Sequence, residues 1–241
     1  MQGAIGIIVA GGEGIRMNAG MRKQYLELGG MPMLSRTLLA IAASPQISEI
    51  YLVVPETDFK YCQTAVIAPS DLKKPVALVA GGKSRQESVY NGLFAIKRDE
   101  GTALIHDGVR PFVAPAHIRA CIQWAEKEGA SIVGVPATDT IKQVTGSGDV
   151  AHTFDRQALW MAQTPQAFEL KYIRKAHEYA RNTGYLGTDD ASIIEHYGGK
   201  VRILRGSPWN IKITTPEDLK LAELMLAGDV LSNIEYQISN S

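Results

Sequence analysis

Short apolar runs rich in β-branched residues recur along the first half of this chain, separated by longer segments with helical spacing. The runs occupy residues 4–10, 50–54, 76–79, 103–106 and 131–136. Such alternation is typical of strands that pair in parallel, because each intervening helix returns the chain across a face of the sheet. The sequence therefore predicts an α/β fold with a mostly parallel, doubly wound sheet, whose ligands bind at the carboxyl ends of the strands.

The first run opens into a glycine-rich loop that carries cations. Gly11, Gly12 and Gly14 allow backbone N–H groups to approach an anion without a Cβ in the way. Arg16 and Lys23 add positive charge that backbone dipoles alone do not supply. A loop of this kind after a buried strand is suited to a polyphosphate, so we expect a nucleotide as the ligand.

The spacing does not fit two familiar phosphate loops. A Walker A loop has a glycine five residues before its Gly-Lys-Ser/Thr, but the chain's Gly-Lys-Ser at 82–84 has Ala77 at that position. A dinucleotide fingerprint that starts at Gly12 needs a glycine or alanine where Met17 stands. P-loop phosphoryl transfer and nicotinamide-dependent oxidoreduction are therefore both disfavoured.

Composition narrows the class of protein. The 241 residues, 45% of them hydrophobic, suit one domain, which we place at 1–227 with a polar tail at 228–241. Lys plus Arg (25) balance Asp plus Glu (25), which argues against nucleic acid or a membrane surface as a partner. Cys62 and Cys121 are isolated, and no run approaches the ~18 apolar residues of a membrane span, so we expect a cytoplasmic protein.

One segment departs from the alternation of strands and helices. Residues 137–160 are rich in Thr, Val, Lys and Gly, and a Gly-Ser-Gly-Asp turn at 146–149 separates two runs of β character. This pattern predicts a β-hairpin arm. A lone hairpin is marginally stable in water, so we expect the arm to pack against a second copy of the chain in a homodimer.

Polar residues follow the third predicted strand. Gly81 and Gly82 lead into a helix whose start carries a capping box formed by Ser84 and Glu87. The backbone at such a strand end is placed to contact a base edge or a phosphate.

A second polar group follows the fourth predicted strand. Asp107 is a candidate ligand of Mg²⁺, directly or through water, because this ion takes one or two carboxylates together with substrate phosphates. An ion pair between Asp107 and Arg110 that only stabilises the loop is the alternative. We expect His106 to be packed or hydrogen-bonded rather than a catalytic base.

Short motifs run through nearly the whole chain, from Ile5 to about Ala227. They are Ala10-Gly11-Gly12-x-Gly-x-Arg16-Met17, Lys23-Gln24-Tyr25, Arg85-x-x-Ser88-Val89-x-x-Gly92-Leu93, His106-Asp107-x-x-Arg110-Pro111, Val135-Pro136-x-x-Asp139-Thr140-x-Lys142, Gln163-Thr164-Pro165-Gln166, Thr188-Asp189-Asp190 and Asn210-Ile211-Lys212-x-Thr214. In this order, they resemble the motifs of the 2-C-methyl-D-erythritol 4-phosphate cytidylyltransferase family.

The resemblance implies a Rossmann-like nucleotidyltransferase fold, a dimer joined through the arm, and the use of CTP with Mg²⁺ or another divalent cation. The implied reaction is attack by the phosphate of methylerythritol phosphate on the α-phosphorus of CTP. It gives 4-diphosphocytidyl-2-C-methyl-D-erythritol and pyrophosphate, in the non-mevalonate route to isoprenoids.

The resemblance also implies roles for individual residues. Arg16 and Lys23 match residues that stabilise the transition state. Arg156 and Lys212 match residues that position the attacking phosphate, and Arg156 would reach the site of the neighbouring subunit. The matched CTP-binding positions are Ala10, Gly11, Gly12, Gly14, Gly81, Gly82, Ser88 and Asp107, with Gly82 and Ser88 near the cytosine. The matched positions for the second substrate are Asp107, Thr140, Arg156, Thr188 and Lys212.

Three residues depart from the family pattern. Gly11 stands where alanine is frequent, Arg22 where proline usually precedes the lysine, and Trp209 where an acid is frequent. Two alternative functions stay open. A ribitol-5-phosphate cytidylyltransferase would share the loop and the chemistry, although the context of Thr140 and Arg156 favours the methylerythritol enzyme. A non-catalytic nucleotide-binding module would not need cations around the α-phosphate.

Overall fold

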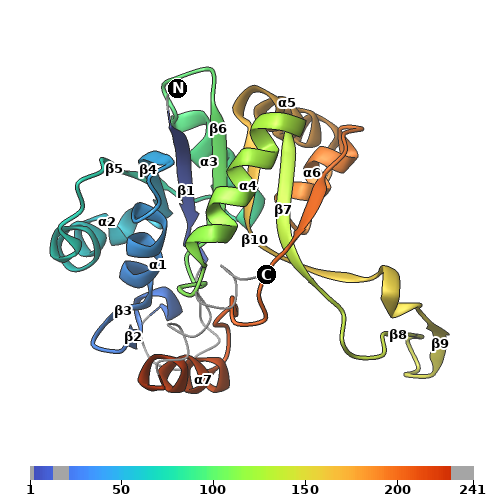
Figure 1. The fold of residues 1–241 in the computed structure, drawn as a ribbon. Helices are drawn as coiled ribbons and strands as arrows, with labels where there is room; N and C mark the ends of the chain where they lie inside the picture. The colour runs from blue at the N-terminus through green and yellow to red at the C-terminus, as the bar shows by residue number, and fades with distance from the viewer. Residues whose placement is uncertain (1–2, 13–21, 229–241) are drawn as a thin grey trace.

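One seven-stranded sheet forms the centre of the part of the chain that the computed structural model describes, residues 3–12 and 22–228 (Figure 1). Its strand order is β11-β7-β10-β6-β1-β4-β5. The strands are β1 (Ala4–Val9), β4 (Ile47–Val54), β5 (Val76–Ala80), β6 (Thr102–Asp107), β7 (Ala130–Pro136), β10 (Trp160–Glu169) and β11 (Arg202–Arg205). Every pairing is parallel except those of β10, which is antiparallel to β6 and β7. The prediction of a mostly parallel α/β sheet is confirmed.

Two strands of the central sheet, β10 and β11, lie outside the predicted set. β10 contains Gln163, Thr164 and Pro165, and a proline among polar residues argues against a central strand. The structure accommodates them because the pairing of β10 with β7 is interrupted between Ala162 and Gln166. β11 has only four residues, with arginine at both ends, and is too short to show a period of two.

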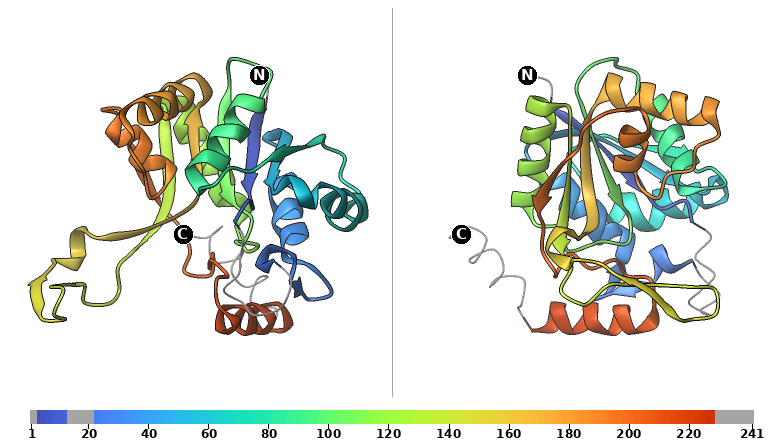
Figure 2. Two further views of the ribbon diagram at one scale, coloured as in Figure 1. Left: turned by 180° about the vertical axis from the view of Figure 1, so that it is seen from behind. Right: turned by 90° about the vertical axis from the view of Figure 1, so that its right-hand side faces the viewer.

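Helices cover both faces of the sheet (Figure 2). α1 (Met33–Ala42) and α4 (Pro115–Glu128) share one apolar core with the sheet, together with short helical turns that include α2 (Phe59–Tyr61) and Cys62–Ile67. α3 (Arg85–Ala95), α5 (Leu170–Thr183) and α6 (Asp190–His196) share the core on the opposite face. The sheet is therefore doubly wound, as predicted. None of the described helices is long and apolar enough to cross a membrane.

A third, smaller core lies at the carboxyl end of the sheet. There α7 (Pro216–Ala227) packs through Ala222 and Met225 against Leu28, in the small hairpin of β2 (Glu27–Leu28) and β3 (Met31–Pro32). α7 begins with a reciprocal capping box between Thr215 and Asp218, and Pro216 occupies its first turn. Val109 and Phe112 belong to this cluster, so it supports the loop that follows β6.

The predicted arm is present and extends away from the body of the molecule (Figures 1 and 2). β8 (Lys142–Val144) and β9 (Val150–Thr153) form its hairpin, and a short 3₁₀ helix at Arg156–Ala158 leads back to β10. The turn closes through Thr145, whose N–H donates to Asp149 O and whose carbonyl accepts from Gly148, a residue with φ of +90°. Residues 138–158 are exposed throughout, as expected for an arm that needs a partner to cover it.

Candidate active site

A cavity of about 890 Å³ opens at the carboxyl ends of β1, β4, β5 and β6. It lies where the strand order reverses, because β4 and β5 continue to one side of β1 while β6 lies on the other. Among the described residues, five basic and three acidic side chains line it, and this excess of positive charge suits an anionic ligand. They are Arg22, Lys23, Lys83, Arg85, Lys212, Glu56, Glu87 and Asp107.

The cavity brings together most of the predicted CTP-binding residues. The predicted residues on its wall are Ala10, Gly11, Gly12, Lys23, Gly81, Gly82, Ser88, Asp107 and Lys212. Gly14 and Arg16 lie outside the described residues. Thr140, Arg156 and Thr188 are not among the described residues that line the cavity. Arg156 lies on the exposed arm, where its Nη1 donates to Thr138 O at 2.8 Å.

One wall of the cavity consists of the glycine loops that follow β1 and β5. The Ser88 hydroxyl joins the start of α3 to this wall, since it accepts from the Gly82 N–H at 3.0 Å and donates to Ser84 O at 2.8 Å. A Cβ on Gly11 would lie 2.9 Å from Ser88 Oγ, and a Cβ on Gly81 would lie 3.2 Å from Gly11 Cα. The two loops touch only because both residues are glycine, which leaves backbone facing the ligand space.

Gln24 holds the glycine loop from behind. Its side chain is buried, and Nε2 donates to Ala10 O at 2.8 Å and to Gly12 O at 3.2 Å. Engaging these carbonyls fixes the loop and occupies oxygens that would repel a phosphate. Gln24 belongs to a motif in the sequence but not to the predicted site residues, because its partners lie 12 and 14 residues away.

The helix start after Gly82 differs in part from the predicted capping box. Ser84 Oγ accepts from the Glu87 N–H at 3.1 Å, as predicted. The Glu87 carboxylate instead accepts from the Lys83 N–H at 2.8 Å, so the reciprocal bond to Ser84 is not formed. Glu87 thereby fixes the peptide that follows Gly82 at the mouth of the cavity.

Asp107 is the centre of a charge cluster at the end of β6. Lys212 Nζ lies 2.8 Å from Oδ2, Arg85 Nε lies 3.1 Å from Oδ1, and Arg110 Nε lies 3.7 Å from Oδ2. Burial alone would raise the pKa of Asp107, but these cations outweigh burial and hold the pKa well below its usual range. Asp107 is therefore a carboxylate at neutral pH. The ion pair with Arg110 named as the alternative is present, and Lys212 and Arg85 contact the same carboxylate at shorter distances.

Arg85 links this cluster to α6. While its Nε contacts Asp107, its Nη2 donates to Asp190 Oδ2 at 2.8 Å. Asp190 is 1% exposed, and its other oxygen lies 3.4 Å from His177 Nε2 on α5. Burial opposes ionisation of Asp190, yet Arg85 and His177 lower its pKa overall. Arg85 was not among the predicted site residues, because its partners are 22 and 105 residues away in the chain.

His106 has a structural role, as predicted. It is fully buried, with Nε2 at 2.9 Å from Arg110 O and Nδ1 at 3.0 Å from Thr164 Oγ1. Thr164 Oγ1 in turn accepts from the Asp107 N–H. Burial lowers the pKa of His106 to about 4, so the ring is neutral at pH 7 and fixes the loop that carries Asp107.

The polar motif of β10 also supports the site rather than facing the ligand. Gln166 Oε1 accepts from the backbone N–H of Asp190 and Ala191, and its Nε2 donates to Asp189 Oδ2 at 2.8 Å. Asn210 Nδ2 donates to Thr164 O at 2.8 Å. These bonds attach the start of α6 and the segment before Lys212 to β10.

Arg22, one of the departures from the family pattern, lies on the cavity wall. Its Nε lies 3.0 Å from Asp58 Oδ2, which also accepts from the Tyr25 hydroxyl at 2.8 Å. The residue adds a cation to the cavity without disturbing the backbone, since its φ of −65° is one that proline adopts as well.

The residues of the site fit a magnesium ion that is held mainly by substrate. Among the residues that the structure describes, no group of three or more His, Cys, Asp or Glu side chains is placed to hold a metal ion. Asp107 supplies one ionised carboxylate at the cavity wall. A single carboxylate together with phosphate oxygens and water is a common ligand set for Mg²⁺.

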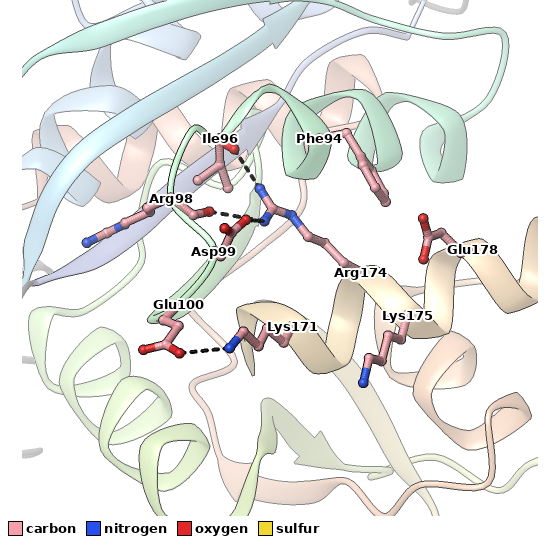
Figure 3. Close-up of a pocket in the computed structure, with 9 residues that line it drawn as sticks. All are labelled: Phe94, Ile96, Arg98, Asp99, Glu100, Lys171, Arg174, Lys175 and Glu178. Carbon is pink, nitrogen blue, oxygen red and sulfur yellow. Dashed lines mark hydrogen bonds and ion pairs between the residues drawn. The ribbon is translucent and has the colours of Figure 1, made fainter.

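A second hollow, of about 1040 Å³, lies at the opposite end of the sheet, beside the loop between α3 and β6 (Figure 3). Most of its charged groups bind other side chains or the backbone. Arg174 donates to the carbonyls of Leu93, Ile96 and Arg98 at the end of α3. Lys171 pairs with Glu100 at 2.7 Å. These contacts account for Arg174, Lys171 and Glu100 as part of the fold.

Comparison with known proteins identifies the family. The sequence model of the 2-C-methyl-D-erythritol 4-phosphate cytidylyltransferase family matches residues 4–228. Proteins of that name from Syntrophotalea carbinolica and Geobacillus kaustophilus are 51% and 49% identical to this chain, over 91% and 92% of it and 94% and 96% of their own lengths.

Solved structures agree with the sequence relatives. The 4-diphosphocytidyl-2C-methyl-D-erythritol synthase of Anaerococcus prevotii superimposes with a TM-score of 0.83 at 31% identity, over 94% of this chain and 96% of that one. The 2-C-methyl-D-erythritol 4-phosphate cytidylyltransferase of Thermus thermophilus gives a TM-score of 0.75 at 30% identity, over 93% and 98%. The chain therefore belongs to the 2-C-methyl-D-erythritol 4-phosphate cytidylyltransferase family.

Proposed function

We propose that this protein transfers CMP from CTP to 2-C-methyl-D-erythritol 4-phosphate, forming 4-diphosphocytidyl-2-C-methyl-D-erythritol and pyrophosphate in isoprenoid biosynthesis. The observation that carries the proposal is the cavity itself, in a chain of this family. Glycine backbone from two strand ends lines the same cavity as Lys212 and Asp107, where the described side chains carry an excess of positive charge. Such a site holds a triphosphate against an anionic second substrate.

The chemistry places few demands on proton transfer. A phosphate oxygen of the second substrate forms a bond to the α-phosphorus of CTP, and the bond from that phosphorus to the pyrophosphate oxygen breaks. The nucleophile is already an anion at neutral pH, so catalysis consists of aligning two anions and neutralising the charge that develops. A neutral His106 bonded to Thr164 and Arg110 fits a site that needs no general base.

The cations divide between the two substrates. Lys23, on the wall beside Gly12, is assigned to the triphosphate and, with Arg16, to the transition state. Lys212, held at 2.8 Å from Asp107, is assigned to the attacking phosphate. Asp107 thus keeps the ammonium group at the junction of the two substrates. Thr188, next to the Asp189 cap of α6, is assigned to the second substrate.

Mg²⁺ is proposed as the cofactor, with Asp107 as its protein ligand, directly or through water. When bound, the ion neutralises charge on the triphosphate and the departing pyrophosphate. The oxygens of Asp107 already contact Lys212 and Arg85, which favours the water-mediated contact.

A homodimer through the arm is proposed to complete the site, with Arg156 and Thr140 entering the cavity of the neighbouring subunit. The arm carries exposed apolar side chains that a partner would cover, including Val144 (59% exposed) and Val150 (60%). Trp160 and Met161, at the base of the arm, continue this surface.

Pyrophosphate release tests the reaction. Purified protein receives CTP and Mg²⁺ with either methylerythritol phosphate or ribitol 5-phosphate, with the Arg16→Ala variant as control. Release with methylerythritol phosphate alone is the expected result. Release only with ribitol phosphate would reassign the second substrate, and CTP binding without release from either would indicate a non-catalytic module.

Mixing two inactive variants tests the shared site. Arg156→Ala has an intact cavity and Lys212→Ala an intact arm, so a mixed dimer would regain one complete site. If subunits exchange freely, an equimolar mixture should recover about a quarter of the wild-type activity. No recovery after verified subunit exchange would show that Arg156 does not act across the dimer.

A further inference from the structure

Asp190 is a buried carboxylate that the helix it begins does not need. α6 is capped by Asp189, whose Oδ1 accepts from the Ser192 N–H at 2.9 Å, and the Asp190 N–H is bonded to Gln166. The Asp190 side chain is 1% exposed and points instead to Arg85, at 2.8 Å. A buried carboxylate destabilises a fold unless it is paired, so its partner indicates its role.

Arg85 is held by two carboxylates on two different elements. Its Nε contacts Asp107 at the end of β6, and its Nη2 contacts Asp190 at the start of α6. The planar guanidinium presents its donors in a fixed fork, so the second contact determines how the first is oriented. Arg85 also lines the cavity, so this fork forms part of the wall of the proposed substrate site.

Asp107 has to satisfy both Arg85 and Lys212. Arg85 takes Oδ1 at 3.1 Å, which leaves Oδ2 for Lys212 at 2.8 Å, with Arg110 farther away at 3.7 Å. Of the two carboxylates that contact Arg85, only Asp107 would remain without Asp190. Arg85 would then compete with Lys212 for both oxygens of Asp107. The position of the Lys212 ammonium group therefore depends on a residue that does not line the cavity.

We infer that Asp190 is a positioning residue for cytidylyl transfer: it orients Arg85, so that Asp107 presents one oxygen to Lys212 in the geometry that aligns the attacking phosphate. The inference rests on the proposed function. It predicts an effect on the step that uses the second substrate rather than on the binding of CTP, whose glycine wall Asp190 does not touch.

The test uses Asp190→Asn, Arg85→Lys and the double variant that combines these two changes. Asp189→Asn is the control. Asp190→Asn keeps the shape of the side chain but removes its charge, and a lysine at position 85 keeps the charge but not the fork. Each single variant should lower kcat about 10- to 100-fold, as loss of a supporting contact does at comparable sites. The KM for CTP should change less than about threefold.

The double variant separates positioning from general damage. If the two residues act as one pair, its kcat should be close to that of the more impaired single variant. Asp189→Asn keeps an oxygen that can cap the same helix but removes the charge and the acceptor of the Gln166 Nε2 hydrogen bond, so it should lower the melting temperature slightly while leaving kcat within about twofold of wild type. If Asp190→Asn does not fold, Arg85→Lys alone decides by the same split between kcat and KM.

Wild-type turnover in the same assay keeps this test independent of the proposed function. Multiplying effects in the double variant, an equal loss of kcat in Asp189→Asn, or single variants that fold and retain wild-type kcat would each overturn the inference. Absence of turnover in the wild-type protein would instead overturn the proposed function.

Discussion

The two hollows of this molecule are similar in size and both are lined by charged side chains, yet they differ in what their charges bind. In the hollow at the amino end of the sheet, Arg174 binds helix carbonyls and Lys171 pairs with an exposed glutamate (Figure 3). At the carboxyl end, loop glycines present backbone and Lys212 stands over a buried carboxylate. Volume and charge alone therefore do not identify a site. Placement at the carboxyl ends of the parallel strands distinguishes the candidate active site.

The largest expected effect compares one lysine from each hollow. Lys212 and Lys171 both lie within 2.8 Å of a carboxylate oxygen. Lys212→Ala should lower kcat about 10²- to 10³-fold, the usual cost of losing one charge-stabilising donor. Lys171→Ala should leave kcat within about twofold of wild type, since its pair is exposed. Pyrophosphate release measures both, and equal losses would contradict the comparison.

The same contrast explains how far the sequence predicts the molecule. The strands β1, β4, β5, β6 and β7 were predictable because each is a continuous apolar run that can be recognised from neighbouring residues alone. The glycine wall was predictable for the same reason, as Gly11 and Gly12 follow β1 directly.

Features that depend on distant partners were not predictable. β10 has buried polar residues that are satisfied by groups far away in the chain, such as Ser207 O for Gln163. Its sequence therefore resembles a loop. Arg85 and Gln24 are ordinary members of motifs until the fold brings their partners to them, at separations of up to 105 residues. Long-range hydrogen bonding leaves no periodicity for a sequence pattern to report.

A second prediction uses the burial of ionisable groups at the carboxyl end. The folded protein holds His106 neutral with a pKa of about 4, whereas the unfolded chain takes up a proton near pH 6.5. Stability should therefore fall as the pH falls from 6.5 toward 4, by about 3 kcal/mol from this group at the lower end. The cations around Asp107 add acid sensitivity only at still lower pH, in the range where carboxylates titrate.

Urea unfolding at several pH values measures this dependence. His106→Asn should be less stable than wild type at pH 7 and should show a flatter decline toward pH 4. His152→Asn, a change in the exposed arm, provides the matched control and should keep the wild-type slope. An unchanged slope in His106→Asn would mean that other groups produce the acid sensitivity.

The smallest expected effect on activity comes from Arg174, in the hollow at the amino end of the sheet, where we expect a loss of stability instead. Arg174→Met keeps an unbranched apolar side chain but removes the guanidinium, which lies over the Phe94 ring and donates to Leu93 O, Ile96 O and Arg98 O. Unfolding free energy should fall by about 2 kcal/mol, as expected for hydrogen bonds from a charged group. Urea denaturation measures the change, with Lys175→Met on the same hollow as the control.

Enzyme kinetics decide what that loss of stability means. Because Arg174 secures the end of α3, while the cavity is built at the start of the same helix, its loss should leave kcat and both KM values within about twofold of wild type wherever the protein is folded. A fall in kcat without unfolding would show that the position of α3 as a whole is transmitted to Ser84 and Arg85. The amino-end hollow would then be a second place from which the active site is controlled.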